Sequence, residues 1–199
     1  MVSFLTESAQ ALKAQVYSFG SSVYQISEDK TIASRLKICE DWDLSIDLKL
    51  PVQNTDEWIN VFGLTIENPS EWLTEPFGIW SGSNIPAVWI QPKSENPGLK
   101  LKLSVGYTPI GSRYYRHDDP TERDWDSWIN LKVSQTSGMF EVKINNVIVD
   151  SISNSNPQDW NDVKIVMGNT YGASGYGSYR SAVGEYRNFE IRSCSSIVF

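Results

Sequence analysis

The sequence predicts an all-β fold in which two antiparallel sheets pack as a sandwich. Three observations indicate it: short runs of alternating apolar and polar residues, glycine, proline and asparagine between those runs, and a chain of 199 residues. Alternation with a period of two places one side of each strand in a core and the other in solvent. A series of such strands separated by turn residues is typical of a sandwich, and all-β sandwiches of this length form one domain.

Residues 1–22 differ from the rest, and we interpret them as an extension of a sandwich that covers residues 23–199. Their apolar residues recur with the 4-3-4-3 spacing of a helix: Leu5, Ala9, Leu12, Val16 and Phe19. A helix over this segment and a first strand that begins near Ala14 both remain open. In either case the segment would serve packing or assembly.

From residue 23 onward the periodicity is that of strands. The run 139–152 predicts a hairpin, because Asn145 and Asn146 suit the positive φ angles of a tight type I′ turn. The expected strands and this hairpin lie at 35–42, 43–51, 57–66, 85–92, 99–107, 128–135, 139–152, 162–168 and 185–193.

The region from Trp125 to Met167 carries the most specific pattern. A tryptophan precedes a strand, then come the hairpin "SGMFEVKINNVIVDS", a loop with Trp160, "VKIVMGN" and finally "GEYRNFEIRS". This arrangement resembles the concanavalin A-like lectin/glucanase superfamily, and laminin G-like modules in particular, over roughly residues 34–193. The resemblance implies a jelly-roll sandwich. It says little about function, because that fold carries lectins, hydrolases, lyases and adhesive modules.

The same resemblance bears on the two cysteines, Cys39 and Cys194. In this fold the last strand lies in the same sheet as an early strand. If the runs "RLKICEDW" and "NFEIRSC" are antiparallel neighbours, the two cysteines face each other, and we expect a disulfide between them. Two separate thiols are the alternative.

Net charge and hydropathy exclude several partners. The net charge of −7 argues against nucleic acid, heparin-like polyanions and anionic membranes, which need clustered basic residues. The sequence holds no apolar run long enough for a transmembrane helix. The N-terminus lacks the pattern of a signal peptide. An intracellular protein and the mature form of a secreted one both remain open, and we expect the secreted one.

No catalytic motif is recognisable. Retaining glucanases of this superfamily need two carboxylates close together on one face. The nearest candidates, Asp41, Asp43 and Asp47, lack the accompanying glutamates and are expected to be solvent-facing acids. His117 is the only histidine and has no nucleophile motif to serve. We therefore expect a protein that is not an enzyme, with a glycan-active hydrolase as the least favoured reading.

The loop 113–126 is the candidate calcium site. Asp118, Asp119 and Asp124 offer carboxylate oxygens, the ligands that calcium prefers. A solvated acidic loop with internal salt bridges to its arginines is the alternative.

Aromatic and polar residues in three loops suit a saccharide, because sugars stack their C–H faces on aromatic rings while polar groups bind their hydroxyls. We therefore expect a lectin-like module for a glycan or glycoprotein. The alternative is a structural or adhesive domain that binds protein or self-assembles as a homo-oligomer. The candidate ligand-binding residues are Trp80, Asn84, Tyr114, Tyr115, Arg116, Tyr171, Tyr176 and Tyr179.

Overall fold

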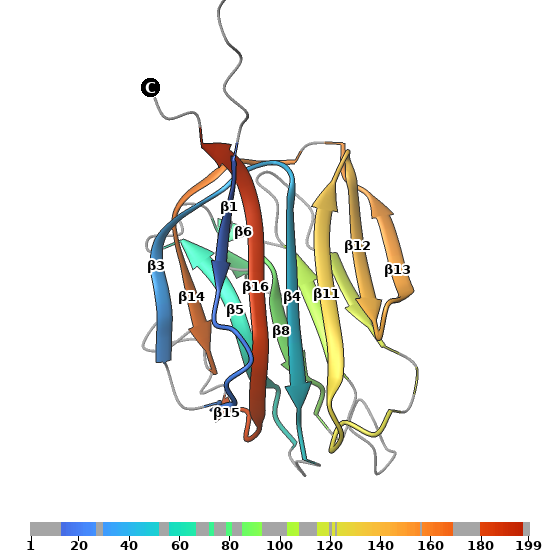
Figure 1. The fold of residues 1–199 in the computed structure, drawn as a ribbon. Helices are drawn as coiled ribbons and strands as arrows, with labels where there is room; N and C mark the ends of the chain where they lie inside the picture. The colour runs from blue at the N-terminus through green and yellow to red at the C-terminus, as the bar shows by residue number, and fades with distance from the viewer. Residues whose placement is uncertain are drawn as a thin grey trace, which may run out of the picture.

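Two sheets form two layers in the computed structural model, and no helix occurs among the residues that it describes (Figure 1). In the part of the chain so described, no helix is long and apolar enough to cross a membrane. The structure describes residues 13–26, 30–51, 56–66, 72–73, 79–80, 85–92, 103–107, 115–119, 121, 123–155, 157–168 and 180–196.

The front sheet has six strands in a path and β2 (Tyr24–Gln25) beside β16. Its order is β1 (Lys13–Ser18), β16 (Glu185–Ser196), β4 (Trp42–Lys49), β11 (Ile129–Thr136), β12 (Met139–Ile144) and β13 (Val147–Ser153). All its pairings are antiparallel.

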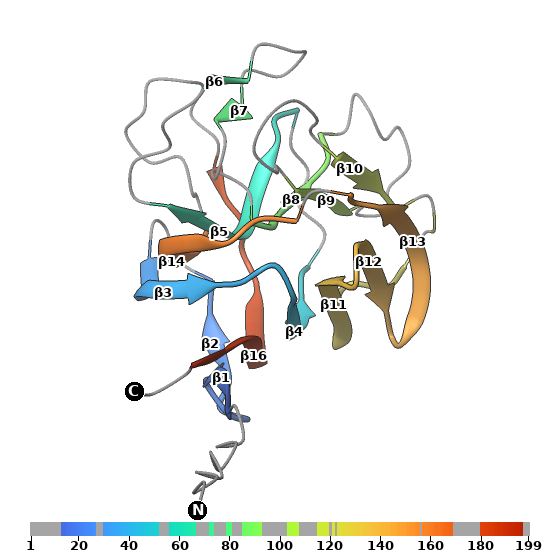
Figure 2. The same ribbon diagram turned by 90° about the horizontal axis from the view of Figure 1, so that it is seen from above.

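The back sheet likewise has six strands in a path and a seventh, β15 (Arg180–Ser181), which runs parallel to β5. Its order is β10 (Tyr115–Asp118), β9 (Leu103–Tyr107), β8 (Ala87–Ile90), β5 (Ile59–Ile66), β14 (Trp160–Met167) and β3 (Lys30–Ile38). A separate two-stranded ribbon joins β6 (Trp72–Leu73) and β7 (Ile79–Trp80). Figure 2 shows the two layers from above, with β10 and β13 at the same side of the sandwich.

The core lies between the sheets, and the alternation of the sequence fills it. On β4, Leu44, Ile46 and Leu48 are buried while the residues between them reach the surface. Strand β5 differs, since every residue from Ile59 to Thr65 is buried and both of its sides are therefore covered. The outer surface of the front sheet at β4 is therefore open to solvent, unlike both sides of β5.

The predicted hairpin is confirmed. Asn145 and Asn146 have φ angles of 51° and 65°, and Ile144 pairs with Val147 across the turn. Asparagine tolerates this left-handed conformation better than other residues with a Cβ. The local sequence is therefore sufficient to specify the turn.

The helical alternative for the N-terminal segment is wrong over residues 13–18, which form the edge strand β1 along β16. Phe19 then turns inward, where its ring contacts Tyr17, Tyr24 and Phe189 edge-on. Aromatic contacts with distant residues outweigh the local helical spacing. Residues 1–12 lie outside the described residues.

The expectation that the run "RLKICEDW", residues 35–42, lies antiparallel beside the last strand holds at Trp42, which pairs with Ser193, and is wrong for residues 35–38 of β3. Strand β3 pairs with β14 in the back sheet, whereas β16 pairs with β4 in the front sheet. Cys39 follows β3 in the chain, however, and its backbone N–H donates a 2.8 Å hydrogen bond to Ser193 Oγ. The chain thus brings Cys39 to the residue before Cys194 by crossing from one sheet to the other. Of the described cysteines none is free, and Cys39 is in a disulfide. The side chain of Cys194 lies outside the described residues, so the Cys39–Cys194 pairing stays a prediction.

Candidate functional site

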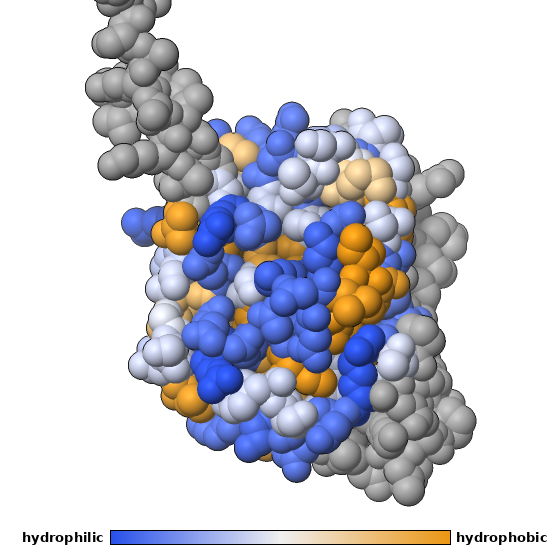
Figure 3. Space-filling view, turned by 45° about the vertical axis from the view of Figure 1, so that its right-hand side comes forward, coloured by the Kyte–Doolittle hydropathy of each residue, from blue (hydrophilic) through white to orange (hydrophobic). Residues whose placement is uncertain are grey.

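The outer face of the front sheet is polar across its centre. Figure 3 shows mainly hydrophilic residues over it, with hydrophobic ones gathered toward the side of β12 and β13. The alternation that buries the apolar residues of β4, β11 and β16 turns their polar ones outward. These outward residues include Asp43, Ser45, Asp47, Lys49, Asn130, Lys132, Glu185, Arg187 and Glu190.

Strand register places three of these side chains in a row. Asp47 on β4 lies opposite Asn130 on β11 on one side and opposite Arg187 on β16 on the other. Residues directly opposite each other in a sheet have their Cβ atoms about 5 Å apart, within reach of direct contact. Residues remote in sequence thus meet on one face.

Asp47 is the centre of the resulting hydrogen-bond network. Its Oδ1 accepts from Asn130 Nδ2 at 2.8 Å, and its Oδ2 accepts from Asn188 Nδ2 at 2.7 Å. Arg187 Nε also donates to Oδ2, at 3.4 Å. Both carboxylate oxygens are therefore fixed by neighbouring side chains, and Asp47 holds those side chains in turn.

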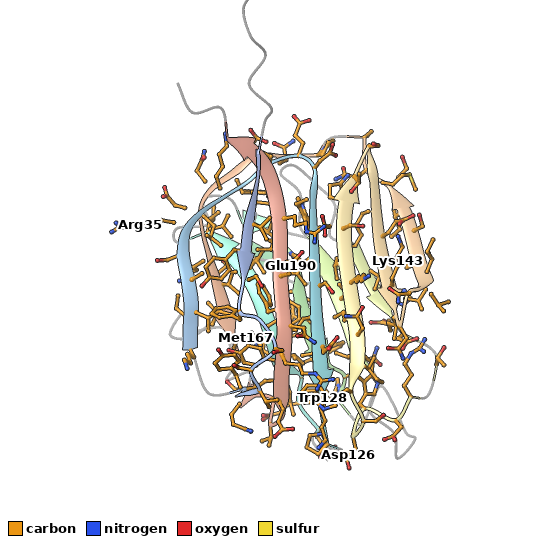
Figure 4. The ribbon with its side chains drawn as sticks, viewed as in Figure 1. Arg35, Asp126, Trp128, Lys143, Met167 and Glu190 are labelled. Carbon is orange, nitrogen blue, oxygen red and sulfur yellow. The ribbon has the colours of Figure 1, made fainter. Side chains whose placement is uncertain are left out.

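Arg187 reaches across β4 to a tryptophan on the far side. Its guanidinium carbon lies 4.2 Å from the centre of the Trp128 ring, a cation–π contact. The strands β16 and β11 flank β4 and are about 9–10 Å apart, a distance that the long arginine side chain spans. Figure 4 shows Trp128 at the start of β11, with Asp126 beyond it and Glu190 farther along β16.

A β-bulge completes the arrangement. The register between β16 and β4 shifts between Arg187 and Glu190, and Asn188 within this bulge has a φ of 50°. The extra residue lets two successive side chains, Arg187 and Asn188, reach the same carboxylate. Asn188 N donates to Gly20 O at 2.9 Å, which ties the bulge to the turn after β1. We call Asp47, Trp128, Asn130, Arg187 and Asn188 the Asp47 cluster.

Four polar atoms of the cluster have no hydrogen-bond partner among the described residues. Within the described residues, neither terminal nitrogen of Arg187 has a hydrogen-bond partner, and Asn188 Oδ1 has none either. Asn130 Oδ1 is buried without one. The side chain of Arg187 is 33% exposed and that of Asp47 is 16% exposed. The cluster is therefore fixed by its internal hydrogen bonds and still accessible from solvent. Such a surface can bind a ligand through both donors and acceptors.

Asp43 lies on the same face of β4 in different surroundings. Burial among its neighbours raises the pKa of the Asp43 carboxyl, Arg192 on β16 lowers it, and Glu190 raises it further. Glu190 is itself paired with Arg192. Asp41 accepts a hydrogen bond from Ser137 N at 2.9 Å. The acids of this run therefore lie at the surface, as expected, and Asp47 and Asp41 hold neighbouring groups in place.

His117 links the two sheets at their shared side. Its Nδ1 lies 3.1 Å from Asp150 Oδ2, so a residue of β10 contacts a residue of β13. Its Nε2 is buried without a hydrogen-bond partner in the described part of the chain. This pair belongs to the packing of the two edge strands.

The predicted ligand-binding residues lie largely outside the described residues. Backbone positions are described for Trp80 on β7 and for Tyr115 and Arg116 on β10. The side chains of these three, and all of Asn84, Tyr114, Tyr171, Tyr176 and Tyr179, fall outside. Their roles stay predictions.

The acidic loop shows internal salt bridging where it is described. Asp119 is buried, and its carboxylate accepts from Arg123 Nε at 2.6 Å and from Thr121 N at 3.1 Å. Asp118 is exposed, and Asp124 accepts from the backbone of Asp126 at 3.2 Å. Over the described stretches of the chain, no group of three acidic, histidine or cysteine side chains could hold a metal. The calcium site stays a prediction.

The Asp47 cluster is not predictable from local sequence patterns. Parity along each strand does place Asp47, Asn130 and Arg187 on outward positions. What joins them is the order β16–β4–β11 and the bulge at Asn188, neither of which a local pattern encodes.

Comparison with known proteins identifies the fold and no family. No protein-family model matches the chain, and no curated protein sequence matches it. Solved structures do match. The heptameric pentraxin of Limulus polyphemus is 12% identical with a TM-score of 0.55, over 92% of this chain and 77% of that one. Domain 4 of the arabinanase AbnA from Geobacillus stearothermophilus, in complex with arabinotriose, is 14% identical with a TM-score of 0.51, over 92% and 84%.

The binding domain of botulinum neurotoxin DC, in complex with SialylT, is 10% identical with a TM-score of 0.51. The match covers 95% of this chain and 45% of that one. At these identities the likeness concerns the fold alone. The predicted jelly-roll β-sandwich is confirmed.

Proposed function

We propose that this protein is a non-catalytic, lectin-like module that binds a glycan on the outer face of its front sheet. The observation that carries the proposal is the Asp47 cluster: a partly exposed tryptophan beside an arginine, an aspartate and two asparagines fixed to one another. Saccharide sites combine an aromatic surface for the sugar's C–H groups with fixed polar groups for its hydroxyls. Because its side chains hold one another, the cluster loses little conformational entropy on binding.

The fold supports a binding module in general terms. Two of the similar structures were determined with a ligand, arabinotriose in one and SialylT in the other. This likeness in fold does not identify a ligand for the present chain. We extend the proposal to a place in the concanavalin A-like superfamily, to a glycoprotein as a partner and to an extracellular location. The loop residues predicted from the sequence would add contacts at the rim.

Truncation of Trp128 tests the proposal. We expect Trp128→Ala to weaken binding to the best saccharide of a glycan array by about tenfold or more, equivalent to about 1.4 kcal/mol. The control is Lys143→Ala, which alters the outer face of β12 away from the cluster (Figure 4) and should keep the affinity. Isothermal titration calorimetry measures both, with thermal unfolding as a check of folding.

The outcomes separate the parts of the proposal. If the intact chain binds no saccharide of a broad array, the lectin-like function is wrong. If Trp128→Ala leaves saccharide binding unchanged, the binding site is not at the Asp47 cluster, and the aromatic loops become the candidate site. The same titration in calcium and in chelator tests the calcium prediction, since loss of binding in chelator would indicate a bound ion.

The second candidate function, self-assembly, has one observation in its favour. Val147 and Ile148 on the edge strand β13 are 64% and 53% exposed. Exposed apolar residues on an edge strand favour pairing with the same strand of a second copy. Sedimentation of the intact chain beside Ile148→Lys decides it: a dimer that the substitution dissociates supports self-assembly, and a monomer in both samples contradicts it.

A further inference from the structure

The hydrogen-bonding groups of the Asp47 cluster that remain available are mixed in kind. Arg187 offers N–H donors on both terminal nitrogens, and Asn188 Oδ1 beside it offers an acceptor, all without partners among the described residues. Both side chains are attached to the same carboxylate of Asp47, so their separation is fixed. A ligand that satisfies both must accept a hydrogen bond from Arg187 and donate one to Asn188 Oδ1.

Two adjacent hydroxyl groups of a sugar meet this requirement. Each hydroxyl can donate one hydrogen bond and accept others. One hydroxyl can accept from Arg187 while its neighbour donates to Asn188 Oδ1. A carboxylate only accepts when it is ionised, and it would leave the asparagine oxygen unsatisfied.

The charges around the cluster oppose an acidic ligand. An unpaired arginine presents a fork that fits carboxylates, but Asp47 already neutralises Arg187 from the Nε side. Glu185 lies on the same face two residues along β16, where it contacts Lys49 at 3.7 Å. Asp126 is exposed beside Trp128, and the net charge of the chain is −7. Lys132 on β11 shares this face, but its Nζ donates to Asn146 Oδ1 at 2.8 Å, in the turn between β12 and β13. Within the cluster itself, an incoming carboxylate would meet Asp47 and the nearby Asp126, and Arg187 would be the one cation there.

We infer that the Asp47 cluster selects a neutral saccharide through two adjacent hydroxyl groups, with Arg187 as donor and Asn188 as acceptor. This inference rests on the proposed glycan-binding function and names its ligand class. The contact with Trp128 holds the guanidinium plane in place, and the ring area that Arg187 leaves uncovered packs against the sugar's C–H groups.

The test compares neutral sugars with their acidic counterparts. The probes are neutral trisaccharides of gluco, manno, galacto, xylo and arabino configuration, the uronic acids that correspond to the hexoses, and deoxy analogues that lack one hydroxyl of the contacted pair. We expect the best neutral probe to bind about tenfold tighter than its uronic acid, and a deoxy analogue to lose about tenfold. Affinity for the neutral probe should stay within about twofold between low and physiological ionic strength, because no net charge is paired.

Variants on β16 assign the selection to Arg187. We expect Arg187→Ala to lose about tenfold or more in affinity and Arg187→Lys to lose less, since lysine keeps a donor but lacks the planar fork. The matched control is Arg192→Ala on the same strand and face, where the arginine is also paired with an acid but lies outside the cluster. Arg192→Ala should keep wild-type affinity. Thermal unfolding of each variant excludes loss of folding.

Each result has a distinct meaning. Equal or tighter binding of the uronic acid overturns the ligand class, even where Arg187→Ala abolishes binding. Neutral binding that survives Arg187→Ala overturns the assigned residues, while the lectin-like function stands at another site. Failure of the intact chain to bind any probe overturns both this inference and the proposed function.

Discussion

Asp43 and Asp47 lie on the same face of β4, yet their surroundings assign them different roles. Asp47 accepts hydrogen bonds from two asparagines and an arginine, which makes it a support for neighbouring side chains. Asp43 has no such partners among the described residues and faces Glu190 as well as Arg192. Asp47 therefore stabilises its neighbours through hydrogen bonds, whereas the ionised form of Asp43 is disfavoured by its surroundings.

The raised pKa of Asp43 predicts a stability that depends on pH. Folding favours the protonated form, so this group's contribution is fully present below its ordinary pKa of 3.8 and is lost as the pH rises through its folded value. Asp43→Asn should therefore stabilise the protein at neutral pH, by less than about 1 kcal/mol because solvent screens an exposed charge. Urea unfolding across the acid range measures it. The gain should vanish below the ordinary pKa, and Ser134→Ala on β11 is a control that does not titrate.

A destabilising Asp43→Asn at neutral pH would contradict this reasoning. It would mean that attraction to Arg192 outweighs burial and repulsion by Glu190.

At the scale of elements, the sequence patterns predicted correctly those strands and turns that depend on interactions between residues close together in the chain. The alternation in β4, β11 and β12 and the turn at Asn145 and Asn146 are confirmed, because burial and positive φ act on neighbouring residues. The N-terminal segment had helical spacing but forms β1, since the contacts that decide its structure come from β16 and Phe189. The spacing of apolar residues within one segment cannot predict that the segment pairs with a strand from the other end of the chain.

The candidate site was unpredictable for the same reason. Its central row needs β16 beside β4 and β4 beside β11, and its second asparagine needs a bulge in β16. The outward position that strand parity predicts for Asp47 is confirmed, but parity alone does not predict its hydrogen bonds to Asn130, Arg187 and Asn188. Residues 47, 130 and 187 become one site only through the order of strands.

At the scale of the whole molecule, the two sheets differ in what they leave open. Both sides of β5 in the back sheet are covered, whereas the outer face of the front sheet is polar and accessible. The front sheet also contains both β1 and β16, so segments near the two ends of the chain lie side by side. The stability of the candidate binding face therefore depends on how firmly the last strand is attached.

The predicted Cys39–Cys194 disulfide would provide that attachment. The backbone N–H of Cys39 already meets Ser193 Oγ at 2.8 Å, at the end of β16 where Ser193 pairs with Trp42. A crosslink that closes so long a loop restricts the unfolded chain and contributes about 4–5 kcal/mol in the chain-entropy model. We expect the double variant Cys39→Ser, Cys194→Ser to unfold at a markedly lower temperature and denaturant concentration. Adding a reductant should destabilise the wild type to the same extent and leave the double variant unchanged. Thiol titration in denaturant is the direct check: no free thiol before reduction and two after it confirm the bond, and two free thiols in the untreated protein contradict it.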